Sequence, residues 1–303
     1  MSKIALVTAI AATGTDTDMV PLIEACARAG LAAEVRAWDD PSVAWTRYDA
    51  ALLRSPWDYT ERLPEFLAWC ERVAAQSRLL NPLPVVRWNT DKHYLADLAA
   101  RGVAVVPSAF VEPEAEPLPA LQAFLAAHAD AAEFVVKPTV SAGSRDTQRY
   151  ARSQEFAAAN HIARLLDAGR SVLLQPYLAS VDRDGETALL YFDGDYSHAI
   201  RKGALLRPDD GGNGTALAPE QIVAREPGQD ERALAQAVLA AARDALKLAT
   251  PLAYARVDLI RDADGTPRLL ELELCEPSLF FPYADGSADR FVARLRERLG
   301  ATN

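Results

Sequence analysis

The segment Phe134-Val-Val-Lys-Pro-Thr-Val-Ser-Ala-Gly-Ser-Arg-Asp146 does most to decide the fold of this chain. Its apolar start predicts a strand over Glu133–Lys137, which delivers a lysine to a loop of small residues. Small residues let backbone N–H groups approach phosphate oxygens closely, and the lysine supplies a positive charge beside them. The segment therefore predicts a phosphate-binding loop, and the alternative is an exposed loop beside a surface lysine.

The patterns of two common nucleotide sites are absent from the sequence. The chain contains neither the P-loop pattern G-x-x-x-x-G-K-[ST] nor the dinucleotide-binding pattern G-x-G-x-x-G. A phosphate site around Lys137 would therefore belong to a different class of protein.

Two predicted strands near the C-terminus form the second informative feature. Tyr254–Ile260 and Arg268–Leu274 flank turn residues at Asp262–Gly265, a pattern typical of a β-hairpin. Charged and apolar residues alternate in both strands, and alternate residues of a strand face the same side. One face of the hairpin is therefore expected to be apolar and the other charged.

The charged face of this hairpin predicts a magnesium site. It would bring together one arginine and three carboxylates, Arg256, Asp258, Glu271 and Glu273. Carboxylates this close repel one another unless a cation is present, and hard oxygen ligands suit Mg²⁺. Acidic residues are also depleted in strands, which favours the metal site over the alternative, an ordinary half-exposed hairpin.

Two weaker signals lie between these features. Gln175-Pro-Tyr-Leu178 followed by Gly185-Glu186 suits an adenosine site, with backbone groups for the adenine edge and a carboxylate for the ribose hydroxyls. The alternative for this segment is a plain strand, turn and strand. The adjacent cations Arg201 and Lys202 predict either a solvated strand edge or charge neutralisation of a phosphoryl group during transfer.

The first part of the chain alternates strands and helices. The pattern predicts a small parallel sheet with helical crossovers, from the segments Ile4–Thr8, Met19–Ala29, Ala33–Ala37, Ala50–Leu53 and Leu63–Ala75. Later segments predict helices over Gln154–Ala168 and Glu231–Leu248, a strand over Ser171–Gln175, and a hairpin of Thr187–Phe192 with Tyr196–Arg201. Glu112–Pro119, rich in Pro and Glu, is predicted to be a surface connection.

The loop Arg54–Tyr59 follows one of the predicted parallel strands. Loops at the carboxyl ends of such strands bind ligands in open α/β sheets. We therefore assign substrate recognition mainly to this loop, and the candidates are Arg54, Ser55, Trp57, Asp58, Tyr59, Arg145 and Ser278. The alternative is that Trp57 and Tyr59 only cap the core of the first domain.

Taken in order, these segments resemble the ATP-grasp superfamily of ligases. The matching run begins at Asn89-Thr-Asp-Lys92, at the start of a helix predicted over Asp91–Arg101. It continues through Lys137 and its loop and closes with the carboxylate hairpin. The resemblance implies an α/β fold, α+β in its later domains. Residues 1–86 would form a Rossmann-like pre-ATP-grasp domain, 87–178 a central lid and 179–303 a C-terminal domain with a mixed sheet.

The resemblance also implies roles for individual residues. ATP would be bound by Lys92, Lys137, Ser141, Gly143, Ser144, Gln175, Tyr177, Leu178 and Glu186. One or two Mg²⁺ ions, for which Mn²⁺ could substitute, would be carried by Asp258, Glu271 and Glu273. Catalysis would rest on Lys137, Arg256 and Arg201. The family commonly ends its metal strand with Glu-x-Asn, so Glu273 at the third position puts one ligand in doubt and makes Glu276 an alternative.

A narrower resemblance is to the cycloserine-forming ATP-grasp enzymes, the O-ureido-D-serine cyclo-ligases of antibiotic biosynthesis. The segments that carry it are Leu53–Tyr59, Arg87–Lys92, Lys137–Asp146 and Glu271–Ser278. Such an enzyme phosphorylates its substrate carboxylate and closes a ring by attack of the substrate's own nitrogen. The alternatives are an intermolecular ligase resembling glutathione synthetase or D-Ala–D-Ala ligase, a small-molecule kinase, and a non-catalytic ATP-binding module.

Composition limits the partners of the chain. The net charge of −10 over 303 residues argues against a nucleic-acid binder, which needs basic stripes. No apolar run approaches a membrane span, so no membrane partner is expected. Three separated cysteines, Cys26, Cys70 and Cys275, indicate reduced thiols in a cytoplasmic protein. We expect a small-molecule carboxylate substrate, and a homodimer is possible.

Overall fold

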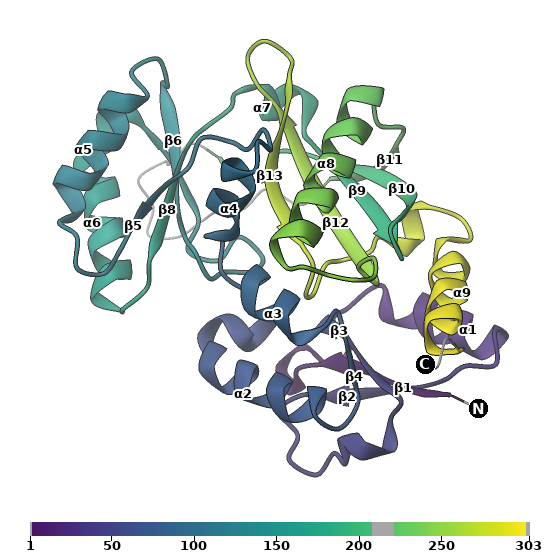
Figure 1. The fold of residues 1–303 in the computed structure, drawn as a ribbon. Coiled ribbons are helices and arrows are strands. Elements are labelled where there is room, and N and C mark those ends of the chain that lie inside the picture. The colour runs from purple at the N-terminus through teal and green to yellow at the C-terminus, as the bar shows by residue number, and fades with distance from the viewer. Residues whose placement is uncertain (1, 208–220, 301–303) are drawn as a thin grey trace.

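The computed structural model describes residues 2–207 and 221–300. The sequence also predicts a polar loop rich in Asp and Gly over Pro208–Thr215, and this segment lies outside the described residues. Within these ranges the chain forms three sheets with helices packed against them (Figure 1). None of the helices in the described ranges combines the length and apolar character that a membrane span requires.

The N-terminal sheet is parallel, with the strand order β2-β1-β3-β4. Its strands are β1 (Lys3–Thr8), β2 (Ala32–Ala37), β3 (Ala50–Ser55) and β4 (Arg78–Leu80), and its helices are α1 (Met19–Arg28) and α2 (Leu63–Ala74). All six residues of β3 are buried, as expected for a central parallel strand that is covered on both faces. The predicted strands and helices of this region are confirmed.

The lid sheet has the order β5-β8-β6-β7 and antiparallel pairing. Its strands are β5 (Ala109–Val111), β6 (Glu133–Pro138), β7 (Gln148–Ala151) and β8 (Val172–Pro176). Helices α5 (Pro117–Ala127) and α6 (Glu155–Asp167) pack together on one face (Figure 1). The prediction of a connection over Glu112–Pro119 is wrong at its end, because Pro117 begins a helix, at a position where a missing N–H costs no hydrogen bond.

The C-terminal sheet has the order β11-β10-β9-β12-β13, with antiparallel strands. Its strands are β9 (Glu186–Phe192), β10 (Asp195–Lys202), β11 (Ile222–Arg225), β12 (Tyr254–Arg261) and β13 (Pro267–Glu273), and α8 (Gln229–Ala245) covers one face. Both predicted hairpins, β9–β10 and β12–β13, are confirmed. A parallel bridge joins Val105 to Leu269 of β13.

The segment before the lid forms two short helices, α3 (Leu83–Asn89) and α4 (Tyr94–Ala100). The predicted helix therefore begins at Tyr94 instead of Asp91. The backbone N–H of Lys92 donates to the carbonyl of Thr139 at 2.9 Å, which ties this part of the chain to the loop after β6. Tyr94 and its neighbours on α4 pack into the core of the C-terminal sheet.

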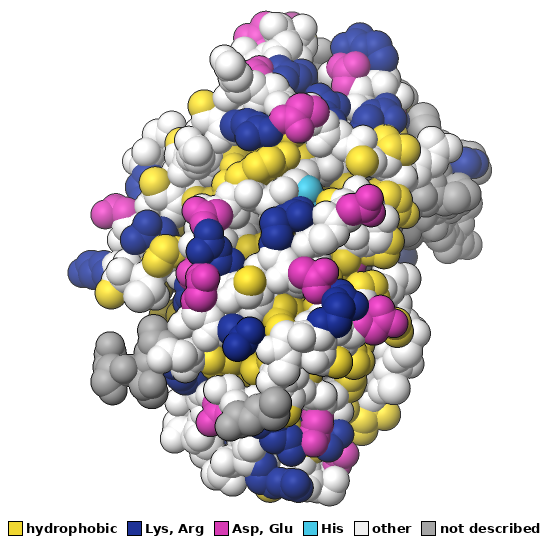
Figure 2. Space-filling view, turned by 90° about the vertical axis from the view of Figure 1, so that its right-hand side faces the viewer, with side chains coloured by type: hydrophobic (Ala, Val, Ile, Leu, Met, Phe, Trp, Pro, Cys, Tyr) yellow, Lys and Arg dark blue, Asp and Glu magenta, His cyan; other side chains and the backbone are white. Residues whose placement is uncertain are grey.

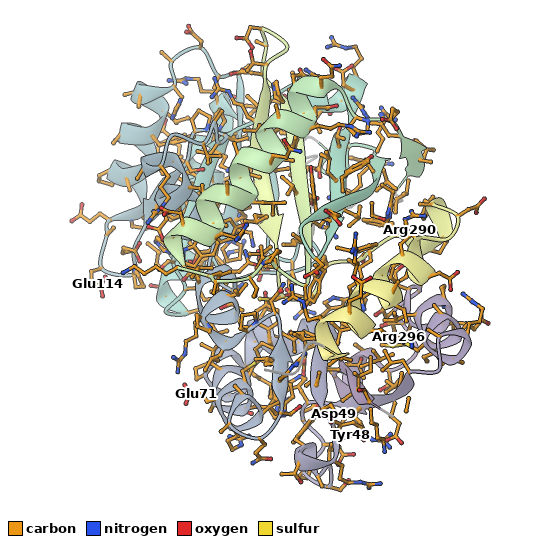
Figure 3. All side chains as sticks on the ribbon, turned by 45° about the vertical axis from the view of Figure 1, so that its right-hand side comes forward. Tyr48, Asp49, Glu71, Glu114, Arg290 and Arg296 are labelled. Atoms are coloured by element: carbon orange, nitrogen blue, oxygen red, sulfur yellow. The ribbon has the colours of Figure 1, made fainter. Side chains whose placement is uncertain are left out.

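The last helix, α9 (Ser287–Gly300), brings the C-terminal part of the chain into contact with the N-terminal part. It packs beside α1 (Figure 1). Arg28 of α1 lies 2.8 Å from Asp289 of α9. On the face in Figure 2 basic and acidic side chains are interspersed, in keeping with such pairs. Figure 3 shows side chains filling the junction between α9, marked by Arg290 and Arg296, and the N-terminal sheet. One hydrophobic core thus contains residues of both the first and the last sheet.

Candidate active site

A cavity of about 650 Å³ opens between the lid sheet, the C-terminal sheet and the segment after β3. It is lined by many of the residues that the sequence singled out: Trp57, Tyr59, Lys92, Lys137, Ser141, Gly143, Ser144, Arg145, Gln175, Tyr177, Leu178, Glu186, Arg256, Glu271, Glu273, Glu276 and Ser278. Residues from all three predicted domains therefore meet at one site.

Two lysines lie beside the small-residue loop. Lys137 is buried at the end of β6, and burial lowers the pKa of its ammonium group to about 8. Lys92 Nζ donates to the carbonyl and the hydroxyl of Ser141, at 3.0 and 3.1 Å, and lies 3.1 Å from Glu271. Gly143 has a φ of +60°, which a residue with a side chain rarely adopts. Two cations and the compact backbone of the loop therefore lie together in the cavity, an arrangement that suits a phosphate group.

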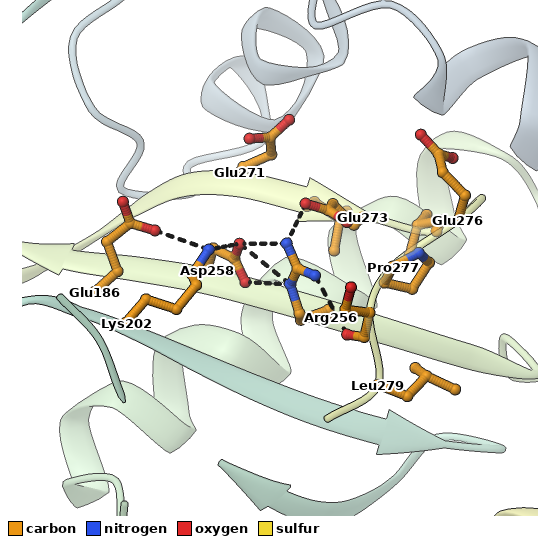
Figure 4. Close-up of polar contacts among 12 residues, drawn as sticks. Glu186, Lys202, Arg256, Asp258, Glu271, Glu273, Glu276, Pro277 and Leu279 are labelled. Atoms are coloured by element: carbon orange, nitrogen blue, oxygen red, sulfur yellow. Dashed lines mark hydrogen bonds and ion pairs between the residues drawn. The ribbon is translucent and has the colours of Figure 1, made fainter. Parts of the chain in front are cut away.

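The hairpin β12–β13 brings the predicted charged residues together, as Figure 4 shows. Arg256 pairs in register with Glu273, and Asp258 with Glu271. Arg256 donates to both oxygens of Asp258 at 2.9 Å and also contacts Glu273. Lys202 of β10 lies 2.7 Å from Asp258 and 2.9 Å from Glu186.

The carboxylates of this face differ in how well their charges are compensated. Burial would raise the pKa of Asp258, but Arg256 and Lys202 lower it to about 2. The pKa of Glu271 is also lowered, because Lys92 and Lys137 outweigh its burial. Burial raises the pKa of Glu273 to about 8, although Arg256 opposes the rise. Glu273 is therefore short of positive charge, whereas Asp258 is not.

This charge distribution decides how a divalent cation fits the site. Among the described residues no group of three or more His, Cys, Asp or Glu side chains is placed so that it could hold a metal ion. Mg²⁺ needs only one or two carboxylates when phosphate oxygens and water complete its shell. Glu271 and Glu273 fit that role, since both line the cavity and each forms an ion pair with one cation, whereas Asp258 forms ion pairs with two. Asp258 fits it less well, because each of its oxygens accepts from a cation.

Arg201 does not lie with the predicted catalytic residues. Its guanidinium donates to the carbonyls of Asp184 at 2.6 Å and Arg183 at 2.9 Å. Lys202 lines the cavity instead, because adjacent strand residues face opposite sides. A β-bulge between Tyr196 and His198 shifts the β9–β10 register, so that Glu186 pairs with Lys202. The structure therefore places Lys202, and not Arg201, in the lining of the cavity.

The loop after β3 contributes less than predicted. Arg54, Ser55 and Asp58 do not line the cavity. Arg54 and Ser55 belong to the buried strand β3, and Ser55 donates to the hydroxyl of Thr8 at 2.9 Å. Asp58 accepts from the indole of Trp38 at 2.8 Å. Of the predicted substrate-binding residues of this loop, the structure therefore places only Trp57 and Tyr59 in the lining of the cavity.

The loop Glu276–Phe281, which follows β13, is held by residues from the first part of the chain. Asp18 accepts the backbone N–H groups of Leu279, Phe280 and Phe281, at 2.6, 3.1 and 2.9 Å. Arg54, fully buried, donates to the carbonyl of Pro277 at 3.1 Å. These contacts join distant parts of the chain, so no local sequence pattern predicts them.

Comparison with known proteins gives the family of the chain. Residues 4–81 match the family model described as the N-terminal domain of D-cycloserine synthetase DcsG. The chain is 52% identical over 301 residues, 99% of each chain, to the cycloserine biosynthesis protein DcsG of Streptomyces lavendulae. The chain belongs to the DcsG family. It also superposes on a crystal structure of D-cycloserine synthetase DcsG with a TM-score of 0.93 and 51% identity, covering 98% of this chain and 100% of that chain.

More distant structures show the same fold as the DcsG family. The D-alanine–D-alanine ligase of Bacillus anthracis superposes with a TM-score of 0.66 at 14% identity, over 99% of this chain and 97% of that chain. The ATP-grasp ligase PsnB gives 0.63 at 19% identity, over 97% and 100%. The predicted ATP-grasp fold and the resemblance to the cycloserine-forming enzymes are therefore confirmed. The chain is an ATP-dependent ligase, and its fold family uses ATP with a divalent metal.

Proposed function

We propose that the chain converts O-ureido-D-serine to D-cycloserine at the expense of ATP. The observation that carries the proposal is the similarity to DcsG, a cycloserine biosynthesis protein, which extends over 99% of both chains. The cavity supports it, because its lining includes both the lysines that suit phosphates and two substrate candidates, Tyr59 and Ser278.

The nucleotide is bound by the lid side of the cavity. Lys92, Lys137 and the loop Ser141–Ser144 hold its phosphates, and the strand end Gln175–Leu178 contacts the adenine. Glu186 binds the ribose. One or two Mg²⁺ ions, or Mn²⁺, would be held by Glu271 and Glu273, and would neutralise phosphate charge.

The first chemical step joins substrate and phosphate. The substrate carboxylate attacks the γ-phosphorus of ATP, and the acyl phosphate forms as the bond to ADP breaks. The protein contributes position and charge, which is most of what phosphoryl transfer requires. Arg256 and Lys202 both line the cavity, and Asp258 holds both cations in place.

The second step closes the ring. The substrate nitrogen bonded to oxygen attacks the acyl carbon, and inorganic phosphate leaves. Hydrolysis of the remaining carbamoyl group then releases ammonia and carbon dioxide. Because an acyl phosphate hydrolyses in water, the lid with the loop Val140–Asp146 must cover the site during these steps.

The test is ADP release from purified enzyme with O-ureido-D-serine, followed by mass spectrometry of the products. D-cycloserine with one ADP per ring is the expected result. A dipeptide formed with a second amino acid would replace the proposal with an intermolecular ligase, and a stable phosphorylated product would replace it with a kinase. No ADP release with any amino acid or ureido amino acid would leave only an ATP-binding module.

The setting of the enzyme is proposed on similar grounds. We place it in the cytoplasm, where its buried free cysteines, Cys26, Cys70 and Cys275, would stay reduced. We also propose a homodimer, because related ligases often form dimers. Light scattering of the purified enzyme tests this proposal.

A further inference from the structure

One carboxylate in the cavity differs from the others in its partners. Glu186 and Asp258 are paired with Lys202, Glu271 with Lys92, and Glu273 with Arg256. Glu276 lines the same cavity, and among the residues that the structure describes it has no cationic partner within ion-pair distance. A carboxylate partly withdrawn from water is costly unless a positive charge accompanies it. We therefore expect a bound ligand to supply the positive charge that pairs with Glu276.

The surroundings of Glu276 fix its position. The hydroxyl of Tyr59 interacts with its carboxylate and lowers its pKa, and the indole Nε1 of Trp57 donates to its backbone carbonyl at 3.2 Å. In Figure 4 its carboxylate points to the same side of the hairpin as that of Glu271, beyond Glu273 along the chain. Burial raises the pKa of Glu276 to about 7, in keeping with a carboxylate that lacks a cation.

The neighbours of Glu276 also indicate the kind of cation. Trp57, Tyr59 and Phe280 line the cavity with it. Aromatic rings with a carboxylate suit an organic ammonium group, which gains from both ring faces and an ion pair. Divalent metals prefer water and oxygen ligands, and Glu271 and Glu273 already provide the one or two carboxylates that Mg²⁺ takes.

We infer that Glu276 binds the α-ammonium group of the substrate, and so selects carboxylates that are amino acids. The inference rests on the proposed function and specifies how its substrate is recognised. The ammonium group lies one carbon from the reacting carboxylate of an α-amino acid. Glu276 therefore positions that carboxylate, in addition to selecting it.

The experiment compares two substrates and two enzymes. O-ureido-D-serine and its deaminated analogue, 3-(ureidooxy)propanoate, are tested with the wild type and with Glu276→Gln, which keeps the size of the side chain and removes its charge. We expect the wild type to prefer the amino acid by about 10- to 100-fold in kcat/KM, the effect of one charged hydrogen bond, and the variant to lose that preference. ATP affinity and the Mg²⁺ concentration for half-maximal rate should change by less than about threefold.

Controls separate the possible failures. Glu65→Gln, at an exposed carboxylate outside the cavity, should behave as the wild type. If Glu276→Gln needs more Mg²⁺ but keeps the preference for the amino acid, Glu276 is a metal ligand and the inference is overturned. The inference is also overturned if the wild type and the variant prefer the amino acid to the same extent and their Mg²⁺ dependence is unchanged. If Glu276→Gln does not fold, Tyr59→Phe removes only the hydroxyl donor and should weaken the same preference. Failure of the wild type to make D-cycloserine would instead reject the proposed function.

Discussion

The ammonium nitrogen of Lys202 lies 2.7 Å from Oδ2 of Asp258, across the central strand of the C-terminal sheet. Lys202 is on β10 and Asp258 on β12, with β9 between them. Both side chains are buried, and Asp258 also binds Arg256. Asp258 thus holds two cations, Lys202 and Arg256, beside the other carboxylates of the site. The neighbouring Arg201 cannot take part, because its side chain faces the opposite side of the strand.

We predict that Lys202→Met reduces kcat/KM by about 100-fold, since it removes a fixed cation from the place where phosphoryl charge develops. Arg201→Met should stay within about threefold of the wild type, because the Arg201 side chain binds backbone carbonyls away from the cavity. ADP release under saturating ATP measures both. Equal losses in the two variants would contradict the placement of Lys202.

Lys137 should make ATP binding sensitive to alkaline pH. Burial lowers the pKa of its ammonium group to about 8, so the free enzyme loses this positive charge as the pH rises through 8. The ATP phosphates undergo no further ionisation there, so affinity should fall between pH 7.5 and 9, by up to about tenfold per pH unit. Calorimetric titration measures it.

Lys137→Met supplies the control for this pH effect. It should bind ATP weakly, with an affinity that varies little over the same range, and should turn ATP over at a negligible rate while its fold is retained. A steep loss of affinity that persists in the variant would assign the titration to another group.

Two buried histidines should make the protein less stable in acid. Burial lowers the pKa of both His161 and His198 to about 4. Between that value and the ordinary pKa of about 6.5 the unfolded chain binds more protons, so the free energy of unfolding falls as the pH falls, by at most about 1.4 kcal/mol per pH unit for each histidine.

The variant His198→Gln tests this reasoning. It removes a titrating ring whose Nε2 donates to the carbonyl of Leu279 at 2.9 Å, and so it should be less stable than the wild type at pH 7.5. The difference should shrink toward pH 5, as urea denaturation at several pH values would show. A constant difference at every pH would refute a neutral His198 in the folded state.

Asp18 should matter to substrate binding although it does not line the cavity. Asp18→Ala leaves the N–H groups of Leu279, Phe280 and Phe281 without their acceptor, and should lower the free energy of unfolding by about 2–4 kcal/mol. Because the loop also carries Glu276 and Ser278, KM for the amino-acid substrate should rise about tenfold or more, with ATP affinity nearly unchanged.

The matched control for Asp18 is Asp289→Asn. Asp289 forms an exposed ion pair with Arg28, which contributes little to stability. This variant should therefore match the wild type in both KM and stability. A drop in ATP affinity as large as the rise in KM for Asp18→Ala would mean that the whole site, and not the loop alone, depends on Asp18.

The sequence predicts those features whose signal is local. The loop after Lys137 and the hairpin around Arg256 are built from residues close together in the chain, and both appear in the structure. The sequence did not indicate that Lys202, and not Arg201, faces the cavity, because the register of this strand is shifted by a bulge and bulges have no strong sequence pattern. The sequence also did not indicate that Arg54 is buried outside the cavity, because its ion-pair partners, Asp16 and Asp18, are distant in the chain.

Asp18 and the loop that it holds also limit how this protein can be recombined. An exchange of the first domain for that of another ATP-grasp enzyme would remove Asp18 and Arg54, and would leave Pro277–Phe281 without the partners that shape it. Engineering of a new ring-forming specificity therefore has to transfer residues 16–18, 54–59 and 276–281 as one cassette. Residues 16–18 and 276–281 therefore have to be exchanged together, although they are far apart in the chain.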